Sequence, residues 1–150
     1  IMLTSKLKIM FLSTAVFFSG CTSTVNIREY LPLPQDNREY SEIYLRGVFN
    51  WWEAEPDYQL IADDNGAYFV DVKLIADGQP YDFRFADDVY TSEDNCGAAA
   101  VTGKSVTVGQ SVALHCDASS GNLKFMPSET GTYRFLIQPG IAPDLIIKKL

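Results

Sequence analysis

Apolar and polar residues alternate along several short stretches between positions 42 and 150. An alternation with a period of two is typical of a β-strand with one buried face. The first stretch covers residues 42–49 and places Ile43, Leu45, Gly47 and Phe49 on one face and Tyr44, Arg46 and Val48 on the other. We therefore predict a first strand at residues 42–49.

Turn sequences separate this stretch from those that follow. Asp63-Asp64-Asn65-Gly66 suits a tight turn, because asparagine and glycine accept a positive φ angle, and it predicts a hairpin between residues 59–61 and 67–74. Further strands are expected at residues 81–85, 105–108, 112–116, 123–126, 132–137 and 145–149.

Seven to nine short strands, with no helical stretch of ten residues after position 20, predict an all-β fold. We expect an immunoglobulin-like antiparallel β-sandwich that covers residues 42–150. A chain of 150 residues, of which 47% are hydrophobic, can bury one core of ordinary size. We expect no separate catalytic domain.

Residues 1–21 have the layout of an export signal. Lys6 and Lys8 precede an apolar run at residues 9–18, which is shorter than the roughly 20 residues that a membrane-spanning helix needs. The run ends in Phe18-Ser19-Gly20-Cys21, which resembles the lipobox of bacterial lipoproteins. A cleaved signal of a soluble protein and an uncleaved anchor are the alternatives.

The lipobox resemblance implies a signal peptide at residues 1–20 and a lipid on Cys21 that attaches the protein to a membrane. Thr22 in the next position is similar to the pattern of outer-membrane sorting, so we expect an outer-membrane lipoprotein of the bacterial cell envelope. The lipidated cysteine and the polar residues up to position 41 would form a flexible tether.

The two remaining cysteines, Cys96 and Cys116, are predicted to form a disulfide, since a cysteine pair in an exported protein is normally oxidised. A zinc site would need more ligands, and His115 is the only histidine in the chain. The net charge of -7 makes nucleic acid and anionic lipid headgroups unlikely partners.

A family resemblance is carried by Arg46-Gly47-Val48-Phe49-Asn50-Trp51-Trp52, by the hairpin with Gly66 and Tyr68, and by Tyr81-Asp82-Phe83-Arg84-Phe85-Ala86-Asp87. The pattern resembles the starch- and glycogen-binding-like immunoglobulin (E-set) modules that precede pullulanase and amylase catalytic domains. The resemblance implies a non-catalytic module that binds α-glucan oligosaccharides or polysaccharides without a cofactor.

By position, the resemblance implies ligand contacts from Trp52, Tyr90, Asp87 and Asn95. Tyr90 stands where these modules commonly have a tryptophan, and Cys96 stands where they usually have an aromatic residue. In the starch-binding members, aromatic side chains near these positions stack on glucose rings while polar neighbours bond the hydroxyl groups.

The chemistry of sugars leads to a similar set of residues. A sugar ring presents C–H groups on one face and hydroxyls at its edge, so a binder needs exposed aromatic faces beside amides and carboxylates. The predicted ligand-binding residues are Trp51, Trp52, Tyr90, Asn50, Asp87 and Asn95. Side chains alternate along a strand, so we expect one of the two tryptophans to be exposed and the other to lie in the core.

The same residues also suit other functions. A Trp52 side chain that caps the sandwich core is the structural alternative for that residue, and burial of both Trp52 and Tyr90 would leave no sugar site of this family. An exposed Trp51 equally suits an envelope module that binds a protein partner and no sugar. The acid pairs, such as Asp63-Asp64, do not follow the spacing of a calcium-binding EF-hand loop, and sandwich loops rarely form the cleft that paired catalytic carboxylates need. We therefore expect no enzyme activity and no metal site.

Overall fold

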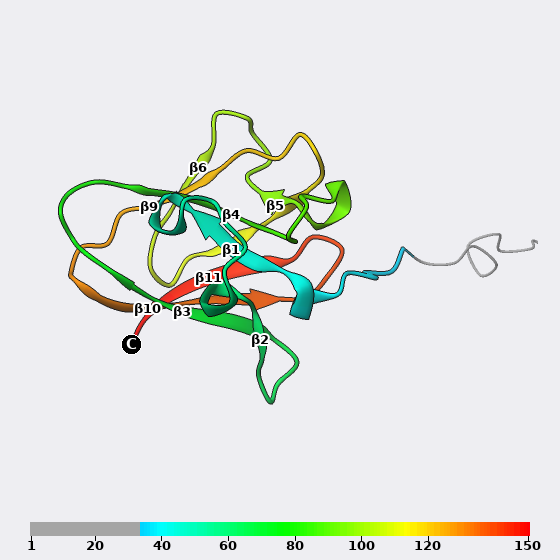
Figure 1. Ribbon diagram of the computed structural model, residues 1–150, viewed down its shortest axis with the longest axis horizontal. Coiled ribbons are helices and arrows are strands. Elements are labelled where there is room, and N and C mark those ends of the chain that lie inside the picture. The colour runs from blue at the N-terminus through cyan, green and yellow to red at the C-terminus, as the bar shows by residue number, and fades with distance from the viewer. Residues whose placement is uncertain (1–33) are drawn as a thin grey trace, which may run out of the picture. The chain divides into compact units, whose positions relative to one another are not determined.

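The computed structural model of the protein describes residues 34–150 (Figure 1). The predicted signal peptide, the lipid on Cys21 and most of the predicted tether lie outside these residues. In the described part of the chain, no helix is long and apolar enough to cross a membrane.

Eleven strands within residues 34–150 form two sheets, as the all-β prediction requires. The first sheet has the strand order β6–β9–β4–β5–β8, and β1 pairs with β4 outside this path. Its strands are β1 (Tyr44–Gly47), β4 (Tyr81–Ala86), β5 (Cys96–Gly97), β6 (Lys104–Val106), β8 (His115–Cys116) and β9 (Leu123–Phe125). All its strand pairs are antiparallel except β6 and β9, which run parallel.

The second sheet has the order β2–β3–β10–β11–β7, and all its pairs are antiparallel. Its strands are β2 (Ile61–Ala62), β3 (Tyr68–Leu74), β7 (Ser111–Ala113), β10 (Gly131–Gln138) and β11 (Asp144–Lys149). The connecting segments include four 3-10 helices: η2 (Tyr40–Glu42), η3 (Val48–Asn50), η4 (Pro56–Tyr58) and η5 (Ser92–Asp94).

The core lies between the inward faces of the two sheets and confirms the predicted period of two. Phe83 and Phe85 of β4 are buried, as are Val70, Val72 and Leu74 of β3. Aromatic rings of the two sheets meet edge to face in this core, for example Phe83 and Phe135, whose ring centroids lie 5.2 Å apart. The sandwich fold is therefore held by side chains that the alternation places on one face of each strand.

The predicted disulfide is confirmed: Cys96 and Cys116 are bonded and lie opposite each other on β5 and β8. The prediction of a single strand at residues 112–116 is wrong. Residues on either side of Leu114 belong to different sheets, because β7 pairs with β11 while β8 pairs with β5. The backbone N–H of Leu114 donates to the carbonyl of Pro143 at this crossover.

The predicted first strand is also shorter than expected. It ends at Gly47, where a Cβ atom would lie 2.6 Å from the carbonyl oxygen of Asp82, so only glycine fits this close approach. After Gly47 the chain leaves the sheet and forms η3. The packed chain also begins before residue 42, because Tyr40 is 96% buried, with 4% of its surface exposed.

Candidate functional site

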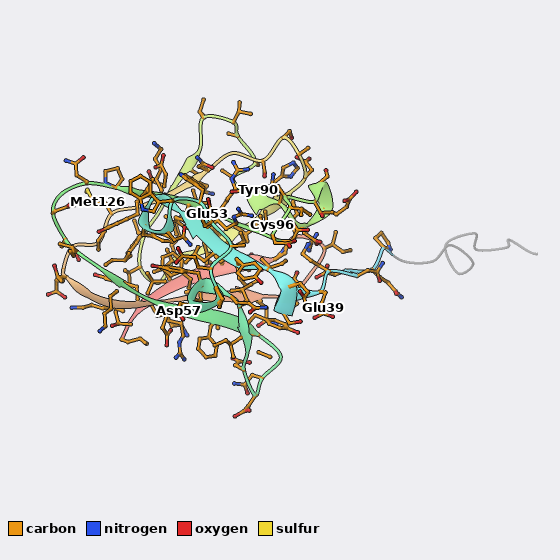
Figure 2. All side chains as sticks on the ribbon, in the orientation of Figure 1. Glu39, Glu53, Asp57, Tyr90, Cys96 and Met126 are labelled. Carbon is orange, nitrogen blue, oxygen red and sulfur yellow. A yellow bond between two sulfur atoms is a disulfide. The ribbon has the colours of Figure 1, made fainter. Side chains whose placement is uncertain are left out.

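The candidate site is formed by two loops that flank β1 and β4. One loop follows β1 and carries both tryptophans. The other loop follows β4 and carries Tyr90, which is labelled in Figure 2. We call the outer side chains of these loops, Val48, Trp51, Trp52, Val89 and Tyr90, the Trp51–Tyr90 surface. The exposed fraction is 85% for Trp51 and 39% for Tyr90, and Val48 and Val89 are exposed as well.

Arg46 holds the two loops together. Its Nε donates to the carbonyl of Trp52 at 2.6 Å, and its Nη1 donates to the carbonyls of Asp87 at 2.7 Å and Asp88 at 3.2 Å. The guanidinium carbon also lies 3.8 Å from the centroid of the Tyr90 ring, and the Tyr90 hydroxyl donates to the carbonyl of Trp52 at 3.1 Å. One buried cation thus fixes both loops, while 39% of the Tyr90 surface stays exposed.

The backbone of this site is strained. Trp51, Trp52 and Tyr90 have φ angles of 55°, 62° and 58°, and they are the residues other than glycine that have positive φ within residues 34–150. A side chain in this left-handed region costs about 1–2 kcal/mol, and such residues gather at functional sites. Trp51 gains no packing in return, because its indole is almost fully exposed.

Asn50 lies beneath the surface and does not face solvent. Its Oδ1 accepts from the backbone N–H of Gly47 and its Nδ2 donates to the carbonyl of Leu45, both at 2.9 Å. Both ends of the amide are therefore used to close the turn after β1, and its exposed fraction is 2%. This geometry gives Asn50 a structural role in place of the ligand contact that we predicted.

Asn95 is also buried. Its Oδ1 accepts a hydrogen bond of 2.9 Å from Nη1 of Arg84, and burial lowers the pKa of that arginine. The same guanidinium donates to Oδ1 of Asn122 and to the carbonyl of Ser120, so Asn95 belongs to a network inside the first sheet. Of the three predicted polar contacts, Asn50 and Asn95 therefore lie away from the exposed surface.

Asp87 lies at the site and shapes its second loop. Its Oδ1 accepts the backbone N–H of Thr91 at 2.7 Å, and its carbonyl accepts from Arg46. The residue is partly exposed, and the Asp88 side chain next to it is exposed. The carboxylates of these two residues are thus the acceptors nearest in sequence to Val89 and Tyr90.

We predicted that one tryptophan would be exposed and that the other would lie in the core; the first part is confirmed and the second is wrong. One indole, that of Trp51, is exposed as expected. Trp52 is partly exposed and lies outside the hydrophobic core cluster, because the left-handed backbone at both tryptophans replaces the strand in which side chains alternate. Arg46 was not predicted as part of the site: the alternation places it on the face opposite the apolar one, whereas the residue is 5% exposed.

In residues 34–150, no three side chains of His, Cys, Asp or Glu are grouped so that they could hold a metal ion. Nε2 of His115 lies 2.6 Å from Oδ2 of Asp117, and the neighbouring cysteine is used in the disulfide. The Trp51–Tyr90 surface itself offers exposed aromatic rings, and the carboxylates of Asp87 and Asp88 belong to the same loop as Tyr90. Such a surface can bind a ligand by stacking and hydrogen bonding.

The sequence matches no protein-family model and no curated protein. The fold is similar to a solved structure described as "Ligand induced structure of AmyP-SBD", a starch-binding domain. The TM-score is 0.54 at 13% sequence identity, and the match covers 98% of this chain and 99% of that chain. The likeness shows that the two chains share a β-sandwich fold.

Proposed function

We propose that this protein is a non-catalytic carbohydrate-binding module that binds α-glucan chains through the Trp51–Tyr90 surface. The observation that carries the proposal is the Trp51 indole, which is 85% exposed on a left-handed residue, in a loop that Tyr90 bonds through the Trp52 carbonyl. The similarity of the fold to a starch-binding domain supports the same kind of ligand.

The geometry suits one face of a glucose chain. The apolar C–H face of a sugar ring would stack on the Trp51 indole or on the Tyr90 ring, and both rings need little further ordering. Arg46 already holds the Tyr90 ring and the Trp52 carbonyl, so the loops are preorganised. The carboxylates of Asp87 and Asp88 would accept hydrogen bonds from sugar hydroxyls at the edge of the rings.

The proposal includes a location. A lipid on Cys21 would anchor the module in the outer membrane of the bacterial cell envelope, and the residues before position 34 would connect the anchor to the domain. This part rests on the sequence pattern of residues 1–22 alone.

A second candidate function is an envelope module that binds a protein. The exposed aliphatic side chains of Val48 and Val89, 47% and 72% exposed, favour it, because they widen the apolar area beside Trp51. A protein partner would cover these valines, whereas a sugar chain would need mainly the rings. Val48→Ser with Val89→Ser should therefore weaken a protein complex much more than it weakens sugar binding.

Affinity electrophoresis in gels that contain amylopectin tests the first function. The informative variant is Trp51→Gly: glycine accepts the φ of 55° and little packing is lost, so the free energy of unfolding should change by no more than about 1 kcal/mol. The wild-type protein should be retarded by amylopectin, and the variant should migrate freely. Val101→Ala is the matched control, since Val101 is 81% exposed on the loop between β5 and β6.

Two results would contradict the proposal in different ways. A wild-type protein that amylopectin does not retard would exclude α-glucan binding of the proposed kind. A Trp51→Gly variant that is retarded like the wild type would show that sugar binds elsewhere on the domain.

A further inference from the structure

A cavity of about 360 Å³, lined mainly by residues with polar side chains, lies next to the loop that carries Tyr90. Its walls are the segment of residues 35–38, the loop residues Thr91, Glu93 and Asp94, and Ile141 from the β10–β11 loop. Sites for small ligands have volumes of about 300–1,000 Å³, so the cavity has room for part of a ligand.

The walls of this cavity are fixed by a hydrogen-bonded network. The Arg38 side chain is 10% exposed; its Nε donates to the carbonyl of Glu93 and its Nη1 to Oδ1 of Asp36, both at 2.9 Å. Oδ2 of Asp36 accepts from the Tyr40 hydroxyl at 2.6 Å and from the backbone N–H of Gly140 at 3.1 Å. Three segments distant in sequence are thus joined around the cavity before any ligand binds.

The groups that remain at the cavity surface can bind hydroxyls. The side chains of Gln35, Asn37, Thr91 and Glu93 make no hydrogen bond to other residues of the described range, 34–150. Amides donate and accept, a hydroxyl does both, and a carboxylate accepts, which matches the mixed needs of sugar hydroxyls. Burial raises the pKa of Asp94, and the carboxylates of this wall disfavour anionic ligands.

The cavity is continuous in sequence with the Trp51–Tyr90 surface. Thr91 follows Tyr90 directly, and the Cα atoms of Tyr90 and Glu93 can be no more than about 11 Å apart, because three peptide links join them. The bond from Thr91 N–H to Asp87 holds the turn between the two regions. A glucan chain that stacks on Tyr90 can therefore extend toward the cavity.

We propose that this cavity is a second, polar subsite for the same neutral oligosaccharide, which binds sugar units beyond those on the aromatic rings. The inference rests on the proposed function. A second subsite makes the affinity depend on the length of the sugar chain. Maltoheptaose should reach both the cavity and the Trp51–Tyr90 surface, whereas maltotriose should occupy the Trp51–Tyr90 surface alone.

Calorimetric titration of a double variant, Asn37→Ala with Glu93→Ala, tests this subsite. Neither side chain is bonded within residues 34–150, so the fold should be retained. The affinity for maltoheptaose should fall about tenfold, as expected for two lost hydrogen bonds, and the affinity for maltotriose should not change. The matched control, Asp64→Ala with Asn65→Ala, removes one carboxylate and one amide from the exposed tip of the β2–β3 hairpin and should bind both sugars like the wild type.

The possible failures are distinguishable. If the double variant binds maltoheptaose like the wild type, or loses maltotriose to the same extent, the subsite is refuted while the proposed function stands. If the wild-type protein binds neither sugar, the proposed function fails, and the subsite fails with it. Thr91→Val, which removes only a hydroxyl, should give a smaller loss for maltoheptaose alone and serves if the double variant unfolds.

Discussion

Replacing Arg46 should disrupt the two loops of the candidate site. The substitution Arg46→Met keeps the length of the side chain and removes the hydrogen bonds to the carbonyls of Trp52, Asp87 and Asp88, together with the contact on the Tyr90 ring. Both loops of the candidate site should then separate from β1.

The magnitude follows from these contacts. A hydrogen bond from a charged group contributes about 1.5–3 kcal/mol, and a partly desolvated cation–π contact about 0.5–2 kcal/mol. The cost of burying the guanidinium offsets a part of this sum. We expect Arg46→Met to lower the free energy of unfolding by about 3–5 kcal/mol, a large loss for a single substitution.

Arg134→Met is the matched control. Arg134 also contacts an aromatic ring, with its guanidinium carbon 4.0 Å from the centroid of Phe69, and it makes two hydrogen bonds of 2.8 Å to Asp71. Its side chain is 35% exposed on the outer face of the second sheet, so the same substitution should cost about 1 kcal/mol or less.

Urea unfolding followed by tryptophan fluorescence measures both losses. The Arg46 variant should unfold at a clearly lower urea concentration than the Arg134 variant, with a similar dependence on urea. If the two substitutions cost the same, Arg46 does not hold the loops in the way that the hydrogen bonds indicate. The two loops would then not be preorganised by this residue.

Two further predictions concern the stability of the domain. Burial is the main cause that raises the pKa of Tyr40 from 10.0 to about 12, and the hydrogen bond to Asp36 is the second. The folded state therefore holds the hydroxyl proton more tightly than the unfolded state does. The stability that this proton provides should be present below pH 10 and disappear as the pH rises through about 12. Urea unfolding across that range should show this loss for the wild type and a smaller one for Tyr40→Phe; equal losses would contradict it. The bond between Cys96 and Cys116 closes a loop with a sequence separation of 20 residues. Replacing both cysteines by alanine should therefore lower the free energy of unfolding by about 3 kcal/mol. Thermal unfolding measures this loss, and an unchanged midpoint temperature would contradict the prediction.

The sequence predicts the central strands well because each is half-buried. In β3 and β4 every second residue faces the core, so Val70, Val72, Phe83 and Phe85 are visible as an alternating pattern. Strands of two residues, such as Cys96–Gly97, are too short to show any period. The sheet crossover at Leu114 also has no local signal, since the partners of its two sides are set by distant strands.

The site was harder to predict than the sheets. The alternation assigned Arg46 to the face opposite the apolar one, but the loop that buries it follows β4, about 40 residues later, and no neighbouring residue reveals that contact. Trp51, Trp52 and Tyr90 adopt a conformation that asparagine and glycine usually supply, so their types do not predict it. Asn50 was predicted as a ligand contact, whereas its amide bonds the backbone as turn asparagines do.

Fluorescence titration of the wild-type protein with maltoheptaose tests the central claim most directly. Both tryptophans of the chain belong to the Trp51–Tyr90 surface, so a ligand that stacks there must change the emission. We expect a saturable change at millimolar sugar that is absent from Trp51→Gly. Unchanged emission throughout the titration would contradict the claim that this surface binds α-glucan.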